Sequence, residues 1–133
     1  MKIEIIKTPT LAKPYAPYAP GVKVQKAGGF IFISGVVPND VEGNIIFKGD
    51  VKNQMRQVLK NMKVTLEDAG VTCNDVVKIT TYVIGEKMKE YVESGGDIEY
   101  LNNFPTPSVT LVGVAALANQ GQLIESEAIA VIK

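Results

Sequence analysis

The clearest periodic pattern of the chain lies between residues 50 and 69. Apolar side chains recur there at spacings of three and four, which is typical of a helix with one buried face. These positions are Val51, Met55, Val58, Leu59, Met62, Leu66 and Ala69. Asp50 precedes the stripe as a candidate N-cap, and Gly70 follows it as a C-terminal stop. The pattern therefore predicts an amphipathic helix that packs on other elements.

Shorter runs rich in β-branched and aromatic residues predict strands. The expected strands cover residues 3–6, 22–25, 30–34, 45–47, 76–84, 108–116 and 123–132. The run at 108–116 is almost entirely small or apolar, so we expect it to be buried on both faces. A weaker helical pattern covers 86–102, and Gly95-Gly96 should break it. The proline-rich segment 8–20 cannot be helical. It is either a flexible linker or, as its two tyrosines favour, a loop that packs on the domain.

This order of elements indicates an α+β protein with two helices on one face of a mixed sheet. The chain has 133 residues, of which 46% are hydrophobic, so one domain over residues 1–133 can bury a core. The strands carry more apolar positions than two helices can cover. We therefore expect the chain to form an oligomer.

The composition excludes several classes of site. The chain has no histidine and one cysteine, which rules out a Ser-His-Asp triad, an imidazole metal ligand and an internal disulfide. Its 14 cationic residues balance its 14 acidic residues, which argues against a nucleic-acid partner. No apolar run approaches the roughly 20 residues of a membrane helix, and no signal peptide is recognisable. We expect a cytoplasmic protein without metal or membrane partner.

Two acidic residues are candidates for chemistry. Glu125 and Glu127 are two positions apart in the last expected strand, so they share a face at about 7 Å from each other. A carboxylate beside apolar surface can position a water or move a proton. Paired acids on strands are common and rarely catalytic, so the spacing alone favours the other role, protection of an exposed edge strand.

Other candidates are weaker when each is taken alone. Ser34-Gly35 ends a hydrophobic strand, where glycine lets a backbone N–H approach a ligand and serine adds a hydroxyl. Tyr18 lies in the proline-rich loop and could stack on a ligand or simply pack. Cys73 has no basic neighbour along the sequence, so we expect an unreactive thiol.

Taken together, these segments resemble the RidA/YjgF family of reactive intermediate deaminases, also described as L-PSP endoribonucleases or translation inhibitors. The resemblance runs over most of the chain. The similar segments are Pro17 to Pro20, Gly28 to Gly35 (family pattern GGLVFVSG), Leu66 to Gly70 (LEAAG), Val76 to Thr80 (DVVKTT) and Leu123 to Ala130 (LVEIEAIA).

The resemblance implies a chorismate-mutase-like α+β fold and a homotrimer with a central β-barrel and ligand clefts between subunits. Active members hydrolyse 2-imino acids or their enamine tautomers to 2-keto acids and ammonia, without metal or organic cofactor. By the same resemblance, Tyr18 matches the cleft tyrosine, and Ser34 and Gly35 match the backbone shelf. Glu125 matches the glutamate that positions water.

One departure from the family pattern affects the function. The pattern Pro-x-Arg-Thr/Ser is replaced by Pro107-Ser108-Val109-Thr110, so Val109 stands where the arginine that binds the substrate carboxylate is expected. Thr110 follows it as a further substrate-side residue. The only arginine, Arg56, lies on the first predicted helix and should not replace it. A lysine such as Lys23 or Lys78 could supply charge instead.

Three functions remain open on the sequence. The first is an imine deaminase with an altered substrate or reduced activity. The second is a non-catalytic trimer that binds a small molecule in the same cleft. The third, an RNA-acting translation inhibitor, fits the neutral charge and missing histidine least well.

Overall fold

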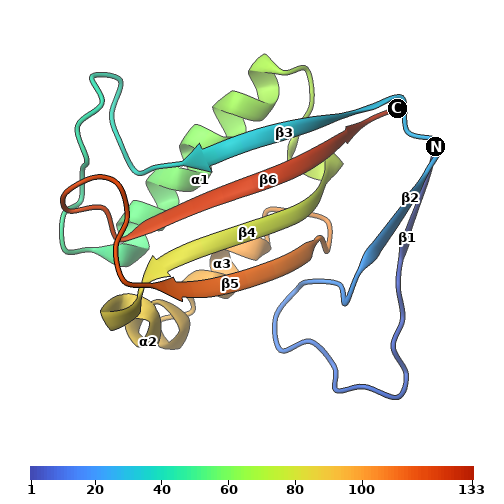
Figure 1. The fold of residues 1–133 in the computed structure, drawn as a ribbon, viewed down its shortest axis with the longest axis horizontal. Coiled ribbons are helices and arrows are strands. Elements are labelled where there is room, and N and C mark those ends of the chain that lie inside the picture. Colours follow the sequence, from blue (N-terminus) through green and yellow to red (C-terminus); the bar gives the residue numbers. More distant parts are fainter.

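The centre of the molecule is a mixed four-stranded sheet. The computed structural model describes residues 1–133 and places the strands in the order β3-β6-β4-β5 (Figure 1). Their bounds are Gly29–Val36 for β3, Val76–Ile84 for β4, Ser108–Val114 for β5 and Ile124–Ile132 for β6. Strands β4 and β5 are parallel, and the other neighbours are antiparallel. The predicted α+β class with a mixed sheet is confirmed.

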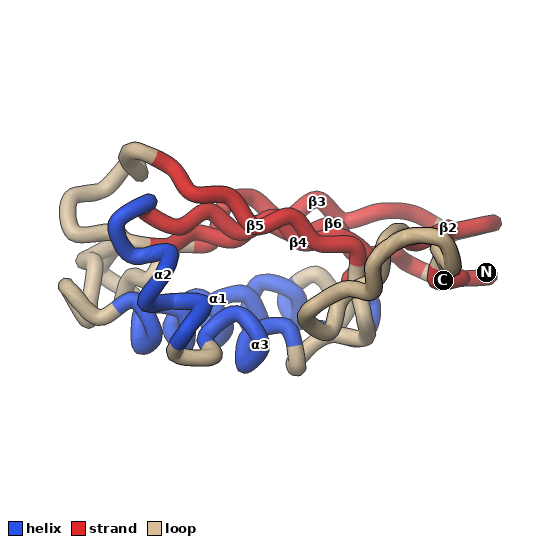
Figure 2. Tube along the Cα trace, turned by 90° about the horizontal axis from the view of Figure 1, so that it is seen from below, coloured by secondary structure: helices blue, strands red, loops and turns tan.

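The helices all lie on one face of this sheet (Figure 2). They are α1 (Val51–Asp68), α2 (Gly85–Glu93) and α3 (Gly96–Leu101). Asp50 caps α1 as expected, because its Oδ1 accepts a hydrogen bond of 3.0 Å from the Asn53 amide. Gly95 adopts a φ of 79° between α2 and α3, which is the break that the two glycines predicted. None of the helices combines the length and the apolar character that crossing a membrane requires.

The two faces of the sheet differ in cover. On the covered face, Met55, Met62 and Leu66 of α1 pack in the core and are fully buried. The opposite face, which we call the open face, carries no helix (Figure 2). Phe30 and Phe32 of β3 lie there with 53% and 74% of their surface exposed. The excess of apolar strand surface that the sequence predicted is therefore present.

The N-terminal residues form a separate antiparallel pair, β1 (Lys2–Ile5) and β2 (Val22–Gln25), beyond one end of the main sheet (Figure 1). The proline-rich segment between them returns to the domain. The Ala19 amide donates to the Pro107 carbonyl at 2.8 Å, and Tyr18 packs against the core. The loop packs on the domain as the sequence predicted.

Two strand predictions were wrong in part. Residues 45–47 form no strand and contribute only an isolated bridge between Asn39 and Ile45, because Phe47 has a φ of 52° and cannot continue an extended segment. The strand predicted at 108–116 ends at Val114 and is not buried on both faces. It lies at the edge of the sheet with β4 as its only partner strand in the sheet, and none of its residues is fully buried within the chain.

Candidate functional site

Glu125 lies at the start of β6 on the open face, directly beside Gly35 of β3. A Cβ atom at Gly35 would be 2.6 Å from Glu125 Oε2 and 2.7 Å from Cδ, so any other residue here would force the Glu125 side chain to move. Gly35 therefore provides the space that the carboxylate occupies. The side chain of Glu125 is partly buried as a result.

Gln122 holds the second oxygen of the same carboxylate. Its Nε2 donates to Glu125 Oε1 at 3.0 Å and to the Ile124 carbonyl at 3.3 Å. The turn that carries Gln122 is fixed to α1, because Gln54 accepts from the Leu123 amide at 2.8 Å and donates to the Gly121 carbonyl at 2.8 Å. Gln54 is fully buried, so Glu125 is held by a network that is anchored in the core.

Glu127 shares the open face but is already paired. The Tyr82 hydroxyl of β4 donates a short hydrogen bond to Glu127, and this bond raises the pKa of Tyr82. Glu125 Oε2 accepts no hydrogen bond from any residue of the chain, and neither does Glu127 Oε2. What distinguishes Glu125 is the gap at Gly35, because its carboxylate is the group nearest to that glycine.

Ser34 lies next to Gly35 at the end of β3. Its exposed side chain follows Phe30 and Phe32 in the alternation of β3, so it belongs to the open face. Ser34 and Gly35 line a hollow of about 420 Å³ that extends towards Asn61 of α1. The structure thus brings Ser34, Gly35 and Glu125 together.

Val109 and Tyr18 lie elsewhere. Val109 pairs in register with Ile79, which is fully buried, and packs against the core on the covered face. Tyr18 also packs against the core, and its neighbour Ala19 bridges to Ser108 at the start of β5. These two predicted substrate residues therefore belong to the free edge of β5, away from Glu125.

The pairing register of β5, β4 and β6 gives the distance between Val109 and Glu125. Val109 is level with Ile79 of β4, and Ile79 pairs with Ala128 of β6, three residues from Glu125. The two side chains are therefore two strands apart, about 10 Å offset along the strand direction and on opposite faces. A single chain does not bring all the predicted site residues together.

Thr110 occupies the open face of β5, where its hydroxyl accepts a hydrogen bond of 3.1 Å from Lys78 Nζ. Lys78 is the one suggested lysine on this face, but it is four residues from Tyr82, the partner of Glu125 in register. Lys23 lies on β2, outside the main sheet. Neither lysine is placed beside Glu125.

Arg56 is engaged on the helix side of the molecule. Its Nε and Nη2 donate to the two carboxylate oxygens of Glu99 at 2.8 and 2.9 Å, and this pair lowers the pKa of Glu99. The prediction that Arg56 does not replace the missing arginine agrees with this placement.

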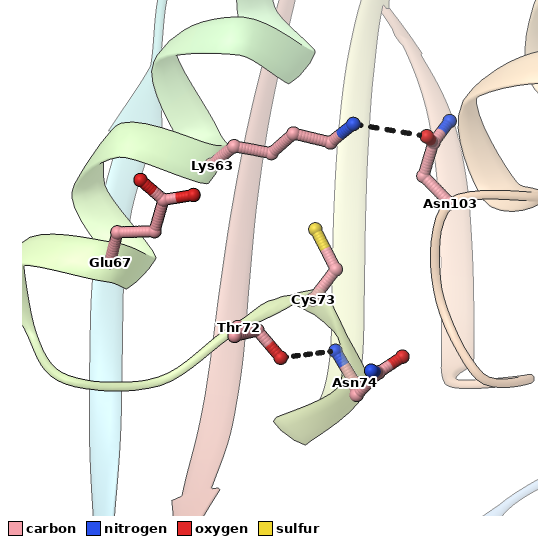
Figure 3. A pocket seen from close by; sticks show the side chains of 6 residues that line it. All are labelled: Lys63, Glu67, Thr72, Cys73, Asn74 and Asn103. Carbon is pink, nitrogen blue, oxygen red and sulfur yellow. Dashed lines mark hydrogen bonds between the residues drawn. The ribbon is translucent and has the colours of Figure 1, made fainter.

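Cys73 lines a polar hollow of about 270 Å³ between the helices (Figure 3). Cys73 has no basic neighbour along the sequence, but folding brings Lys63 of α1 near the thiol, where its Nζ donates to Asn103 Oδ1 at 3.3 Å. Burial nevertheless raises the pKa of Cys73, and Lys63 offsets this only in part. No group of three or more His, Cys, Asp or Glu side chains is arranged to hold a metal ion.

Sequence reasoning missed Gln122 and Tyr82. Both act through contacts with the two glutamates, and neither lies in a motif that was quoted for the family resemblance. The alternation of β6 already placed the two glutamates on one face. It could not show which of them would be paired.

Comparisons with known proteins agree with this architecture. The family model described as Endoribonuclease L-PSP matches residues 8–132. A RutC family protein of Pyrococcus horikoshii is 42% identical over 132 residues, 96% of each chain. The 2-iminobutanoate/2-iminopropanoate deaminase of Dermatophagoides farinae is 31% identical over 137 residues, covering 97% of this chain and 96% of that one.

A solved structure shows the same similarity at the level of the fold. The crystal structure of YyfB, a Rid family protein of unknown function from Yersinia pestis, matches with a TM-score of 0.85 and 30% identity. The match covers 99% of this chain and 100% of that one. The fold is thus the mixed α+β fold of the Rid proteins. The chain belongs to the RidA/YjgF family, to which the Endoribonuclease L-PSP model corresponds.

Proposed function

We propose that the protein hydrolyses small imines or enamines in a cleft between two subunits of a homotrimer. The observation that carries this proposal is the free Oε2 of Glu125, held over Gly35 with no partner in the chain. A half-buried carboxylate with one fixed and one free oxygen is suited to orient a water molecule. The name of the Dermatophagoides farinae relative supports the same reaction class.

The reaction itself needs only a water and proton transfers. The oxygen of water adds to the imine carbon while Glu125 accepts a proton from it, and the π electrons of the C=N bond move to nitrogen, which takes up a proton. Glu125 then returns its proton to the NH₂ group of the resulting carbinolamine, the C–N bond breaks with its electron pair going to nitrogen, and ammonia leaves. The hydroxyl releases its proton to solvent and forms the carbonyl group, which balances the proton that the imine nitrogen took up in the first step. One imine and one water thus give one carbonyl compound and one ammonia.

The separation of the two halves of the site supports the oligomeric part of the proposal. Tyr18 and Val109 lie at the edge of β5, and Ser34, Gly35 and Glu125 lie on the open face. A cleft that contains all of them requires the β5 edge of one chain to meet the open face of another. The exposed Phe30 and Phe32 give this face the apolar surface that a stable subunit contact needs.

Val109 shapes the choice of substrate. In the resemblance, its position belongs to the arginine that binds the carboxylate of 2-imino acids. Valine offers no hydrogen bond, and an unpaired carboxylate beside it would lose several kcal/mol of hydration, by an order-of-magnitude estimate. We therefore propose imines without a carboxylate next to the reacting carbon as the preferred substrates.

A non-catalytic binding protein is the second candidate, and Val109 is the observation that favours it. An apolar side chain in place of the anchor suits a neutral ligand that is held without reaction. The two candidates differ in whether stoichiometric protein changes the rate of imine loss.

A paired assay tests the proposal. An amino-acid oxidase generates 2-iminobutanoate from 2-aminobutanoate, and a flavin amine oxidase generates the neutral imine of butylamine. Semicarbazide traps the imine that remains. We expect the protein to reduce the trapped neutral imine more strongly than the trapped 2-iminobutanoate. Unchanged trapping of both imines at stoichiometric protein would exclude hydrolysis of this class and leave the binding candidate.

The oligomer is tested separately by light scattering. Three chains of 14.3 kDa each are expected in one particle. A mass of one chain would contradict the trimer and with it the composite cleft.

A further inference from the structure

The hydrogen bonds around Gln122 assign a role to this residue that no motif of the chain indicates. Gln122 is 3% exposed and lies in the turn before β6. Its amide contacts a backbone donor at one end and a backbone acceptor at the other. These two backbone contacts show which end of the side-chain amide is the oxygen and which is the nitrogen.

The oxygen end faces Asn119. Gln122 Oε1 accepts from the Asn119 amide at 3.3 Å and from Asn119 Nδ2 at 2.9 Å. The nitrogen end faces the Ile124 carbonyl at 3.3 Å and Glu125 Oε1 at 3.0 Å. A backbone N–H only donates and a carbonyl only accepts, so a flipped amide would lose both backbone contacts. The Nε2 group is thus committed to the carboxylate.

The consequence for Glu125 is geometric. Its Oε1 is fixed by a neutral donor, and its Oε2 lies over Gly35, where a Cβ atom would be only 2.6 Å away. None of the four ion pairs of the structure involves Glu125, so no cation competes for the carboxylate. A neutral donor orients a carboxylate without neutralising its charge, which a proton acceptor must keep.

We propose that Gln122 is a positioning residue for Glu125, which holds Oε1 so that Oε2 points to the reacting water. This inference rests on the proposed imine hydrolysis for its catalytic consequence, but the contact itself can be tested without any substrate. Asn119 extends the arrangement by holding the oxygen end of the Gln122 amide.

The kinetic test compares Gln122→Met with a matched control. Methionine keeps the length of the side chain and removes the donor. We expect kcat for the better imine substrate to fall by about tenfold to a hundredfold with little change in KM, since misplacement of a catalytic group has effects of this size. Circular dichroism of the variant separates this effect from a loss of structure.

Asn103→Ala supplies the control. Asn103 donates to the carbonyls of Glu99 and Tyr100 at 2.9 and 3.2 Å, so its removal also costs amide hydrogen bonds, but it lies in the helical layer. We expect kcat and KM of this variant to stay within about twofold of the wild type. A Gln122→Met enzyme with wild-type kcat would overturn the inference.

A second measurement separates this inference from the proposed function. The side-chain NH₂ resonances of Gln122 are followed by NMR from pH 7 to pH 3 in the wild type and in Glu125→Gln. We expect a pH-dependent shift in the wild type that disappears in the variant. If the wild type hydrolyses no imine but shows this shift, the proposed reaction fails and the contact stands. If the pH dependence of the Gln122 resonances is the same in the wild type and in Glu125→Gln, the inference fails even in an active enzyme.

Discussion

The polar side chains on the two faces of strand β6 differ in how completely they are hydrogen-bonded. On the covered face, the Ser126 hydroxyl is completely buried and contacts Thr81 Oγ1 at 3.1 Å and the Tyr100 hydroxyl at 2.8 Å. On the open face, Glu125 keeps one carboxylate oxygen without a partner in the chain. Residues that are neighbours in sequence thus belong to a complete network on one side and an incomplete one on the other.

This difference separates residues that stabilise the chain from residues that need something outside it. Most buried polar side chains of the covered face find a partner within the fold, because bulk water does not reach them, and the Tyr91 hydroxyl is the exception. The open face has no such constraint until another molecule covers it. Its apolar side chains and the carboxylate oxygen without a partner are the features on which the proposed subunit contact and ligand cleft rest.

The largest expected effect comes from placing a charge on the open face. Phe32 is 74% exposed in the single chain, and we expect Phe32→Asp to convert the proposed trimer to monomers. A carboxylate buried in an apolar contact costs several kcal/mol, by an order-of-magnitude estimate. Light scattering measures the mass. Val64→Asp on the outer surface of α1, where Val64 is 52% exposed, is the matched control and should leave the mass unchanged. A trimeric Phe32→Asp would show that the subunits meet elsewhere.

The next effect distinguishes the two glutamates within the open face. We expect Glu125→Gln to reduce imine hydrolysis by at least about a hundredfold, because a neutral amide cannot accept the proton of the attacking water. Glu127→Gln should retain most of the rate, since Glu127 is bound by Tyr82 and it is the Glu125 carboxylate that lies nearest to Gly35. Initial rates of both variants decide the matter, with circular dichroism as a check on folding. Equal losses would mean that the free oxygen of Glu125 is not the feature that matters.

A smaller effect tests Val109, which faces the covered side of the sheet but belongs to the proposed substrate cleft. Val109 faces the covered side but is only partly buried, because it lies on the edge strand. We expect Val109→Arg to raise kcat/KM for 2-iminobutanoate by about tenfold or more, since a charge-assisted hydrogen bond contributes on this scale. The neutral butylamine imine should gain nothing. A parallel change for both imines would show that position 109 does not contact the carboxylate.

Most of the fold was predictable because its signals are local. The stripe of α1 and its cap at Asp50 depend only on neighbouring residues, and so does the break at Gly95. The strand predicted at 45–47 failed because its apolar run says nothing about the positive φ of Phe47. The prediction that β5 is buried on both faces failed because composition does not reveal how many neighbouring strands a strand has.

The candidate site was predictable to a smaller extent. The alternation of β6 placed Glu125 and Glu127 on one face, and the structure agrees. The placement of Val109 on the face opposite to Glu125 depends on pairing between strands that are distant in sequence, which no local pattern encodes. Gln122 became recognisable only from the geometry of its turn. Non-local register and side-chain contacts are therefore what the sequence could not supply.

The smallest effect is expected when the hydroxyl group is removed from either of two buried tyrosines on the covered face. Tyr100 and Tyr91 are both buried to at least 99%, but only the Tyr100 hydroxyl has a partner, Ser126 Oγ at 2.8 Å. Tyr100→Phe should lower the free energy of unfolding by about 1 kcal/mol. Tyr91→Phe should raise it by a similar amount, about 1 kcal/mol, because folding no longer buries an unpaired hydroxyl. Urea denaturation at equal chain concentration measures both.

The pH of this measurement follows from the tyrosines themselves. Burial raises the pKa of both hydroxyls above the ordinary value of 10.0, so both are protonated in the folded state at pH 7. Neither tyrosine ionises in the unfolded chain until the pH nears about 10, and only above that does ionisation favour unfolding. The opposite signs should therefore persist from pH 6 to pH 8. Destabilisation by both substitutions would mean that Tyr91 has found a partner, and that the covered layer satisfies all of its polar groups.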